Sequence, residues 1–176
     1  MPEPGQPDPA TVQLLVLDVD GVLTDGSILI DDAGRETKRF FVRDGVAIRS
    51  WRRLGFEVAL LTGRGGDALT HRVAELGVEH VVQNAHDKGA AVAELAGELG
   101  FDLSLTAFVG DDWPDLPAMR AVGYPIAVAD AEPIVRSAAV FVTTRPGGRG
   151  AVREVVEHLL QSRDLLGRAV GHYDSP

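Results

Sequence analysis

The chain has no cysteine, few aromatic residues and very little lysine. Aromatic residues make up 6% of its 176 residues, and its two lysines, Lys38 and Lys88, stand against fifteen arginines. The lack of cysteine excludes disulfide frameworks, thiol catalysis and cysteine-ligated metal centres, and leaves no sign of an oxidising compartment. Where arginine is the usual cation, a lysine indicates that a compact point charge is needed.

Excess positive charge and long apolar runs are also missing. The formal net charge is −9, with a pI near 4.9, which argues against a protein that binds nucleic-acid backbones. No apolar run reaches membrane-spanning length, and the N-terminus lacks the pattern of a secretory signal. We therefore expect a soluble cytoplasmic protein without nucleic-acid or membrane partners. An anionic metabolite is a compatible ligand if positive charge is gathered in one pocket.

Short apolar runs alternate with segments of helical periodicity. A hydrophobic content of 45% in a chain of this length supports one core and excludes disorder for the bulk of the chain. The alternation predicts an α/β, Rossmann-like parallel sheet flanked by helices. Strands are expected at 12–17, 57–61, 78–82 and 106–109, with weaker candidates at 124–128 and 139–142.

The sequence predicts one domain with a small insertion. Two β-rich runs around a polar turn predict a β-hairpin, inserted after the first strand at about 26–42. Four prolines indicate a disordered leader over 1–11, and the single folded domain is expected to span 12–168. Residues 169–176 are expected to form a flexible tail.

Acidic residues follow two of the expected strands directly. Asp18 and Asp20 come after the first strand, and Asp111, Asp112 and Asp115 follow the strand at 106–109. In open α/β sheets, this carboxyl edge is where ligands bind. Neighbouring carboxylates repel one another unless they share a cation or a proton. Asp-x-Asp-Gly is also good turn chemistry, so a plain surface turn is the alternative.

A hydroxyl group and two cations are expected at the same edge. Thr62, Gly63 and Arg64 end the second strand, and Lys88 opens a helix, where backbone N–H groups favour anions. A simple turn and a solvated lysine are the alternatives. Taken together with the carboxylates, these groups suit Mg²⁺ and a phosphate ester. Asp18 would then be the nucleophile, and Asp20 the general acid and base.

The order of these motifs resembles that of the haloacid dehalogenase superfamily of phosphatases. The likeness is closer still to the 3-deoxy-D-manno-octulosonate 8-phosphate phosphatases and to their relatives that act on nonulosonate 9-phosphates. It covers about residues 12–162 and is carried by residues 17–26, 42–49, 61–64, 109–112, 128–131 and 147–154.

The resemblance implies a set of roles for these residues. Mg²⁺ would be held by Asp18, Asp111 and the backbone carbonyl of Asp20, and the phosphoryl group by Thr62 and Lys88. The substrate would be a small 2-keto-3-deoxy sugar acid phosphate, whose carboxylate suits the planar fork of arginine. The substrate-binding positions would be Asp20, Arg43, Asp44, Gly45, Arg49, Gly63, Arg64, Arg72 and Lys88. The family usually has asparagine where this chain has Phe41.

The predicted hairpin is too small to close the site by itself, although phosphoryl transfer benefits from excluding water. The resemblance implies a homotetramer in which hairpins and a neighbour's C-terminal segment close each site. The glycine-rich segment 147–150 would be flexible enough to reach across, so that Arg149 contacts the neighbour's substrate. An ordinary glycine turn before the last helix is the alternative.

Three other functions compete with this one. The first is hydrolysis of a nonulosonate (sialic-acid-type) 9-phosphate. The second is a non-catalytic phosphatase-like module that acts by oligomerisation or binding. The third is a receiver-type signalling domain, but receivers place their lysine after the acids, whereas Lys88 precedes Asp111 here.

Overall fold

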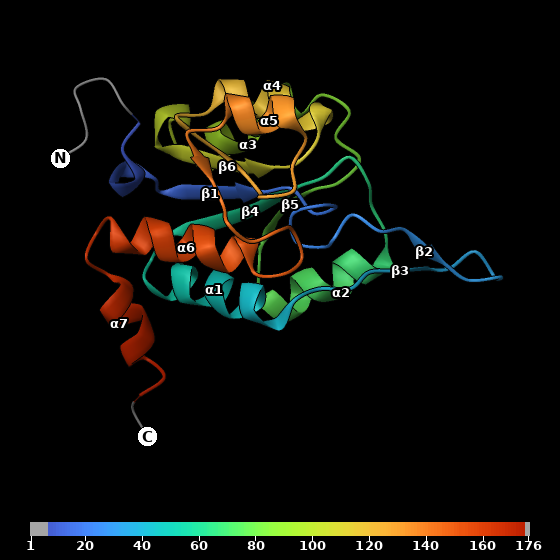
Figure 1. The fold of residues 1–176 in the computed structure, drawn as a ribbon, viewed down its shortest axis with the longest axis horizontal. Coiled ribbons are helices and arrows are strands. Elements are labelled where there is room, and N and C mark those ends of the chain that lie inside the picture. Colours follow the sequence, from blue (N-terminus) through green and yellow to red (C-terminus); the bar gives the residue numbers. More distant parts are fainter. Residues whose placement is uncertain (1–6, 175–176) are drawn as a thin grey trace.

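In a computed structural model, which describes residues 7–174, six strands form one parallel sheet. The strand order is β5-β4-β1-β6-β7-β8 (Figure 1). The central strand, β1, pairs with β4 on one side and β6 on the other. All four of its residues are buried, because helices cover both faces of the sheet, so the strand is a continuous apolar run. The strands are β1 (Leu14–Leu17), β4 (Glu57–Leu61), β5 (His80–Val82), β6 (Thr106–Gly110), β7 (Tyr124–Ala127) and β8 (Phe141–Val142).

The helices lie in two layers, one on each face of the sheet (Figure 1). One layer holds α1 (Val42–Arg53), α2 (Asp67–Leu76) and α6 (Ala151–Gln161), with α7 (Leu166–Gly171) packed beside α1 and α6. The other layer holds α3 (Lys88–Glu98), α4 (Leu116–Ala121) and α5 (Pro133–Ala138). Single 3₁₀ turns occur at Pro9–Thr11, Leu103–Leu105 and Trp113–Asp115.

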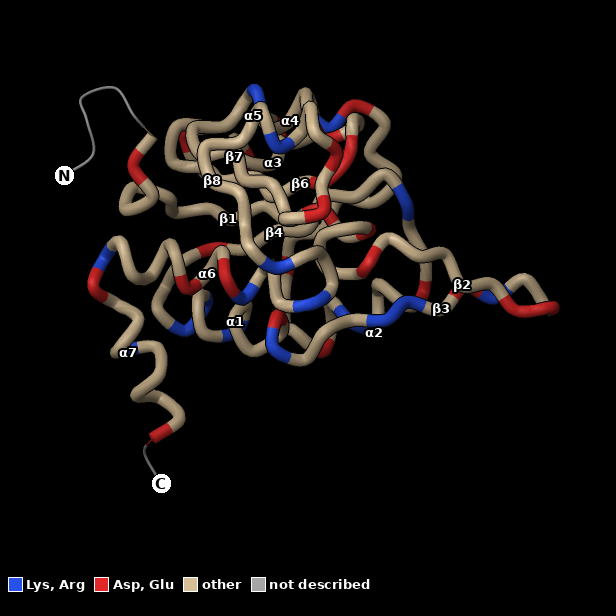
Figure 2. Tube along the Cα trace, in the orientation of Figure 1, with Lys and Arg blue, Asp and Glu red and all other residues tan. Residues whose placement is uncertain are grey.

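A β-hairpin projects beyond the sheet (Figure 1). It consists of β2 (Leu29–Ile30) and β3 (Glu36–Thr37), which pair in antiparallel fashion. The carboxylate of Asp31 stabilises the turn, because its Oδ1 accepts hydrogen bonds from the backbone N–H groups of Ala33 at 2.9 Å and Arg35 at 2.8 Å. Acidic and basic residues lie at the turn and along the β3 side of this hairpin, whereas β2 carries none (Figure 2).

The parallel α/β sheet expected from the sequence is confirmed, but both chain ends are more ordered than expected. The turn Pro9–Thr11 lies inside the expected leader, held by a hydrogen bond from Arg163 Nη1 to the Pro9 carbonyl at 3.3 Å. Helix α7 runs into the expected tail because its Ala169 is buried. The remaining parts of these predictions, at 1–6 and 175–176, lie outside the described residues. No helix in the described range has the length and apolarity needed to cross a membrane.

Candidate active site

Side chains from three strand ends and one helix start meet in a cleft of about 290 Å³ at the carboxyl edge of the sheet. Asp18 follows β1, Thr62 follows β4, Asp111 follows β6, and Lys88 begins α3. Parallel strands bring their carboxyl ends to one edge, so residues far apart in the chain become neighbours. The cleft is lined by Asp18, Asp20, Gly26, Ile28, Thr62, Gly63, Arg64, Ala85, Lys88, Asp111, Asp112, Pro114 and Asp115.

A tight turn after β1 holds the first carboxylates in place. The Oγ1 of Thr24 accepts hydrogen bonds from the backbone N–H groups of Gly21 at 3.3 Å and Gly26 at 3.2 Å. Gly21 has a φ of +92°, and a Cβ atom there would lie 2.0 Å from Asp111 Oδ2. Only glycine therefore allows this turn to approach Asp111 so closely.

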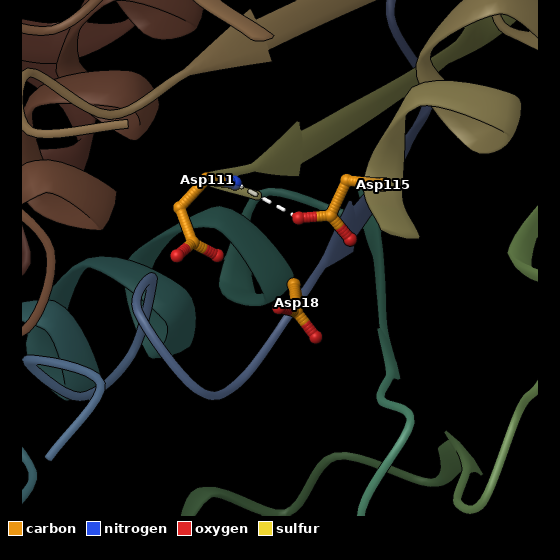
Figure 3. A group of neighbouring side chains, drawn as sticks. All are labelled: Asp18, Asp111 and Asp115. Carbon is orange, nitrogen blue, oxygen red and sulfur yellow. Dashed lines mark hydrogen bonds between the residues drawn. The ribbon is translucent and has the colours of Figure 1, made fainter. Parts of the chain in front are cut away.

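Three carboxylates cluster in the cleft, with ligand atoms of Asp18, Asp111 and Asp115 within 4.8 Å of one another (Figure 3). Both oxygens of Asp115 are engaged. Its Oδ1 accepts a hydrogen bond from Lys88 Nζ at 2.5 Å, and its Oδ2 accepts from the backbone N–H groups of Asp111 at 2.9 Å and Asp112 at 3.2 Å. Asp115 is therefore a structural anchor for the loop.

The other two acids have free oxygens. The Oδ1 atoms of Asp18 and Asp111 are buried without a hydrogen-bond partner among the described residues. Lys88 Nζ lies 2.9 Å from Asp18 Oδ1, as an ion pair that does not meet hydrogen-bond geometry. Buried carboxylate oxygens that accept no hydrogen bond are suitable ligands for a hard cation such as Mg²⁺, so these residues fit a divalent metal ion.

The protonation of these groups follows from burial and crowding. Burial, followed by repulsion from Asp115, raises the pKa of Asp18 to about 7, although Lys88 opposes the rise. Burial and the charges of Asp115 and Asp18 raise the pKa of Asp111 to about 8. Burial alone would lower the pKa of Lys88, but Asp18 and Asp115 outweigh it and raise that pKa. The lysine is therefore an ammonium ion at neutral pH.

Magnesium is expected to stabilise the fold more at alkaline than at acidic pH. The raised pKa values of Asp18 and Asp111 make the folded state bind more protons than the unfolded state between about pH 4 and pH 8, so without metal these groups cost stability as pH rises. Mg²⁺ at one hundred times its Kd adds about 2.7 kcal/mol, or roughly 5–10 °C in Tm. Thermal denaturation in EDTA and in MgCl₂ from about pH 5 to pH 8 measures this.

The matched control for this titration is Asp111→Asn, which removes one of the unpartnered oxygens. The variant is expected to lose most of the magnesium-dependent rise in Tm at the alkaline end. An equal rise in Tm at both ends of the pH range would contradict a metal site built from these two carboxylates.

Asp20 lies beside the cluster and is bound by the hairpin. Lys38 Nζ donates a hydrogen bond to Asp20 Oδ1, and Arg64 Nε lies 3.9 Å from Asp20 Oδ2. Asp20 Oδ2 is buried and has no hydrogen-bond partner in residues 7–174. Glu36 joins the group, 2.8 Å from both Lys38 Nζ and Arg64 Nη2. The two cations thus converge on Asp20 from different parts of the chain.

Thr62 completes the expected phosphate-binding groups, and the expected substrate-binding residue Gly63 lies beside it. The side chain of Thr62 is buried, and its Oγ1 accepts a hydrogen bond from the backbone N–H of Arg64 at 3.2 Å. Its hydroxyl hydrogen is available for donation into the cleft. Gly63 is exposed on the cleft wall.

Six expected substrate-binding residues do not line the cleft of their own chain. Asp44 is buried and accepts hydrogen bonds from the backbone N–H groups of Gly150 at 3.3 Å and Arg153 at 2.8 Å, so it anchors α1 to the start of α6. Gly45 packs against the Arg72 guanidinium, which pairs with Glu75 at 2.7 Å. The remaining three are Arg43, which is exposed, Arg49, which lines a groove at the amino end of β4, and Arg149.

The segment 147–150 is packed rather than free, which differs from the expectation. A Cβ on Gly147 would lie 1.7 Å from the Gly21 carbonyl oxygen, and the Gly148 N–H donates to the Val22 carbonyl at 2.9 Å. The glycines are needed because this segment lies directly on the turn after β1 of the same chain. Only the Arg149 side chain extends to solvent.

The sequence placed Asp115 among the acids at the ligand-binding edge without a separate role, and it assigned no site role to Lys38 or Glu36. The signal for Asp115 is its place in the Asp-Asp-x-x-Asp run, where an acid three residues after Asp112 can cap the turn. Lys38 stands out as one of only two lysines in an arginine-rich chain. Nothing local marks Glu36 as part of the site.

The chain is similar to known phosphatases over most of its length. The signature of the haloacid dehalogenase-like hydrolase family matches residues 77–154. The 3-deoxy-D-manno-octulosonate 8-phosphate phosphatase of Yersinia pestis is 43% identical over 162 residues, which covers 92% of this chain and 87% of that protein. Its counterpart from Escherichia coli K12 is 44% identical over 160 residues, covering 91% and 85%.

Solved structures agree with the sequence comparison. The 3-deoxy-D-manno-octulosonate 8-phosphate phosphatase of Moraxella catarrhalis, solved with magnesium, phosphate and KDO, superposes with a TM-score of 0.92 at 37% identity, covering 94% of this chain and 95% of that one. The cobalt-bound enzyme of Haemophilus influenzae has a TM-score of 0.89 at 35% identity, covering 93% and 98%. This chain belongs to the haloacid dehalogenase-like hydrolase family, within the branch of these sugar-acid phosphate phosphatases.

Proposed function

We propose that the protein is a Mg²⁺-dependent phosphatase that hydrolyses 3-deoxy-D-manno-octulosonate 8-phosphate to the free sugar acid and phosphate. The observation that carries the proposal is the meeting of Asp18, Asp111, Lys88 and Thr62 in one cleft, where two buried carboxylate oxygens accept no hydrogen bond within residues 7–174. The phosphatase relatives, 43–44% identical to this chain, support the choice of substrate.

The proposed reaction has two halves. A carboxylate oxygen of Asp18 attacks phosphorus and forms an aspartyl phosphate while the bond from phosphorus to the sugar oxygen breaks. Asp20 gives its proton to that departing oxygen. A water molecule then attacks phosphorus, Asp20 takes a proton from it, and Asp18 and phosphate are released. Lys88 and Thr62 hold the phosphoryl oxygens throughout.

Mg²⁺ would be bound by the carboxylates of Asp18 and Asp111 and by the backbone carbonyl of Asp20. When bound, the cation offsets negative charge on the phosphoryl oxygens and on the crowded carboxylates. The fit is supported by the unpartnered oxygens of Asp18 and Asp111 and by the raised pKa of both groups. Asp115 is not a proposed ligand, because its oxygens already accept three hydrogen bonds.

A phosphate-release assay tests the function directly. We expect Mg²⁺-dependent turnover of the eight-carbon sugar acid 8-phosphate, slower turnover of a nine-carbon nonulosonate 9-phosphate, and no turnover in EDTA. Faster turnover of the nine-carbon substrate would reassign the enzyme to the alternative substrate class. Failure to release phosphate from either substrate or from 4-nitrophenyl phosphate would support the non-catalytic module instead.

Arg64→Ala is expected to weaken turnover of sugar acid phosphates more than that of 4-nitrophenyl phosphate. The Arg64 side chain is 44% exposed at the cleft wall, where its guanidinium can pair with a substrate carboxylate that the aryl ester lacks. A charge-assisted pair contributes about 1.5–3 kcal/mol, so kcat/KM for the sugar acid phosphate should fall roughly 10- to 150-fold. Steady-state kinetics on both substrates measure the difference, and equal losses would argue against a carboxylate contact.

We also propose that four copies assemble into a homotetramer. The hairpin exposes Ile28, Leu29 and Ile30, which are 51–63% exposed, and Val42 at its base is 74% exposed. Such a row of apolar side chains on a projecting element is typical of a surface that is covered by a partner. Arg43 and Arg149 do not line the cleft of their own chain. A neighbouring copy would bring its own Arg43 and Arg149 within reach of this cleft.

Sedimentation equilibrium of the native protein and of an Ile30→Asp variant tests the assembly. The Ile30→Asp variant is expected to form smaller species than the native protein. A native protein that sediments as a monomer would contradict the proposed tetramer. The cytoplasmic location and the absence of nucleic-acid partners stay predictions from the sequence.

A further inference from the structure

The hairpin carries one buried cation, Lys38, although most of the hairpin is exposed. The Lys38 side chain is 4% exposed, whereas Leu29 and Ile30 on the same hairpin are 51% and 63% exposed. Lysine is almost never this deeply buried unless it is paired. Here its ammonium group hydrogen bonds to Asp20 Oδ1 and lies 2.8 Å from Glu36 Oε1.

Lys38 belongs to a four-residue network that joins the hairpin to the cleft. Glu36 Oε2 lies 2.8 Å from Arg64 Nη2, so this glutamate bridges the two cations. Burial alone would lower the pKa of Lys38, but its hydrogen bonds to Asp20 and Glu36 raise it overall, and the group stays charged at neutral pH. Residues of the hairpin therefore hold a carboxylate of the turn after β1.

The network makes the two oxygens of Asp20 different. Oδ1 is occupied by Lys38, whereas Oδ2 is buried and accepts no hydrogen bond within the described part of the chain. Arg64 Nε, at 3.9 Å, is too far from Oδ2 for a hydrogen bond. A carboxyl group held through one oxygen presents the other in a defined direction.

We propose that Lys38 is a positioning residue: it holds the Asp20 carboxyl group through Oδ1 so that Oδ2 exchanges the proton with the substrate. The inference rests on the proposed phosphatase function, in which Asp20 is the general acid and base. The proton goes from Oδ2 to the sugar oxygen as the bond from phosphorus to that oxygen breaks and the bond to Asp18 forms. In the second half, Oδ2 takes a proton from the attacking water.

The leaving group separates this role from a structural one. A sugar alkoxide departs poorly without a proton, whereas 4-nitrophenolate departs readily as an anion. In a Lys38→Met variant, single-turnover release of the sugar acid should fall about 10²- to 10⁴-fold, the usual contribution of general acid catalysis. Release of 4-nitrophenolate in the first turnover should fall by about threefold or less, since that step needs no acid.

Two further variants complete the experiment. Lys38→Arg keeps a cation that can pair with Asp20 and Glu36, so its turnover of the sugar acid phosphate should be close to that of the native protein. If Lys38→Met is unstable, Lys38→Arg still tests the inference. Arg35→Met is the matched control, because this hairpin cation pairs at 2.7 Å with the exposed Asp31 and has no contact with Asp20 among the recorded ion pairs of residues 7–174. Its single-turnover rates should equal those of the native protein.

Several results would overturn the inference. Equal losses for the two substrates would make Lys38 a general structural residue, and a raised KM with unchanged kcat would make it a substrate ligand. Failure of Lys38→Arg to recover activity would also count against it. A native protein that releases phosphate from neither substrate overturns the proposed function itself, whereas an active native protein with an equally active Lys38→Met variant overturns only the role of Lys38.

Discussion

Replacing Asp18 with asparagine is expected to reduce phosphate release by at least about 10⁴-fold, a loss typical of removing a catalytic nucleophile. The amide has no anionic oxygen to attack phosphorus, and it is a weaker ligand for a cation. The fold should survive, because asparagine has nearly the same shape and removes one of three crowded carboxylates. Phosphate release at saturating Mg²⁺ and thermal denaturation in EDTA together measure both effects.

Acid quenching during turnover adds a second readout for Asp18. The native protein should retain phosphate covalently, and the Asp18→Asn variant should retain none. Asp102→Asn is the matched control, since this exposed aspartate lies before β6, at the opposite end of the strand from the cleft. Substantial activity in Asp18→Asn would mean that the nucleophile lies elsewhere.

Replacing Lys88 with methionine is expected to abolish turnover and to lower the free energy of unfolding by about 3–5 kcal/mol, the usual cost of breaking a buried ion pair. The Lys88 side chain is 5% exposed, and its Nζ lies 2.9 Å from Asp18 Oδ1 and 2.5 Å from Asp115 Oδ1. Without it, no other cation among residues 7–174 forms an ion pair with the buried carboxylates of Asp18, Asp111 and Asp115. Denaturant unfolding in EDTA, followed near pH 7.5, measures the loss.

A double variant shows whether this destabilisation is electrostatic. Adding Asp18→Asn to Lys88→Met removes one of the buried negative charges that the lysine had balanced, so the double variant should be more stable than Lys88→Met alone. Neighbouring charges are expected to show such non-additive effects. Purely additive losses would indicate that Lys88 contributes through packing of its methylene groups rather than through its charge.

Local patterns predicted the strands and the main site residues for one physical reason. A strand buried on both faces must be apolar along its length, and in a parallel sheet its next residue stands at the ligand-binding edge. Asp18, Thr62 and Asp111 each follow such a strand, so their convergence follows from the apolar runs alone. The helix start at Lys88 adds the cation by the same logic.

Other residues depend on contacts that no local pattern encodes. Asp44 lies within the stretch 42–49, which resembles the family's substrate-binding motif. Its carboxylate nevertheless accepts hydrogen bonds from backbone N–H groups of a segment more than one hundred residues later. Asp111 and Asp115 belong to one acidic run, but the turn between them directs Asp111 to the cleft and Asp115 to the backbone. Periodicity cannot distinguish these destinations, because it describes faces of an element and not their partners.

The amino-acid sequence by itself determined a parallel α/β domain with carboxylates, a hydroxyl group and a lysine at one edge of the sheet. It could do so because the apolar pattern of a buried strand, and the residue that follows that strand, are local properties of the chain. Only the tertiary structure decided which carboxylate oxygens accept no hydrogen bond from the described part of the chain, and that Lys38 reaches Asp20 from the hairpin. Those outcomes depend on how separate loops pack against one another, where the distance between two charges is set by the whole fold.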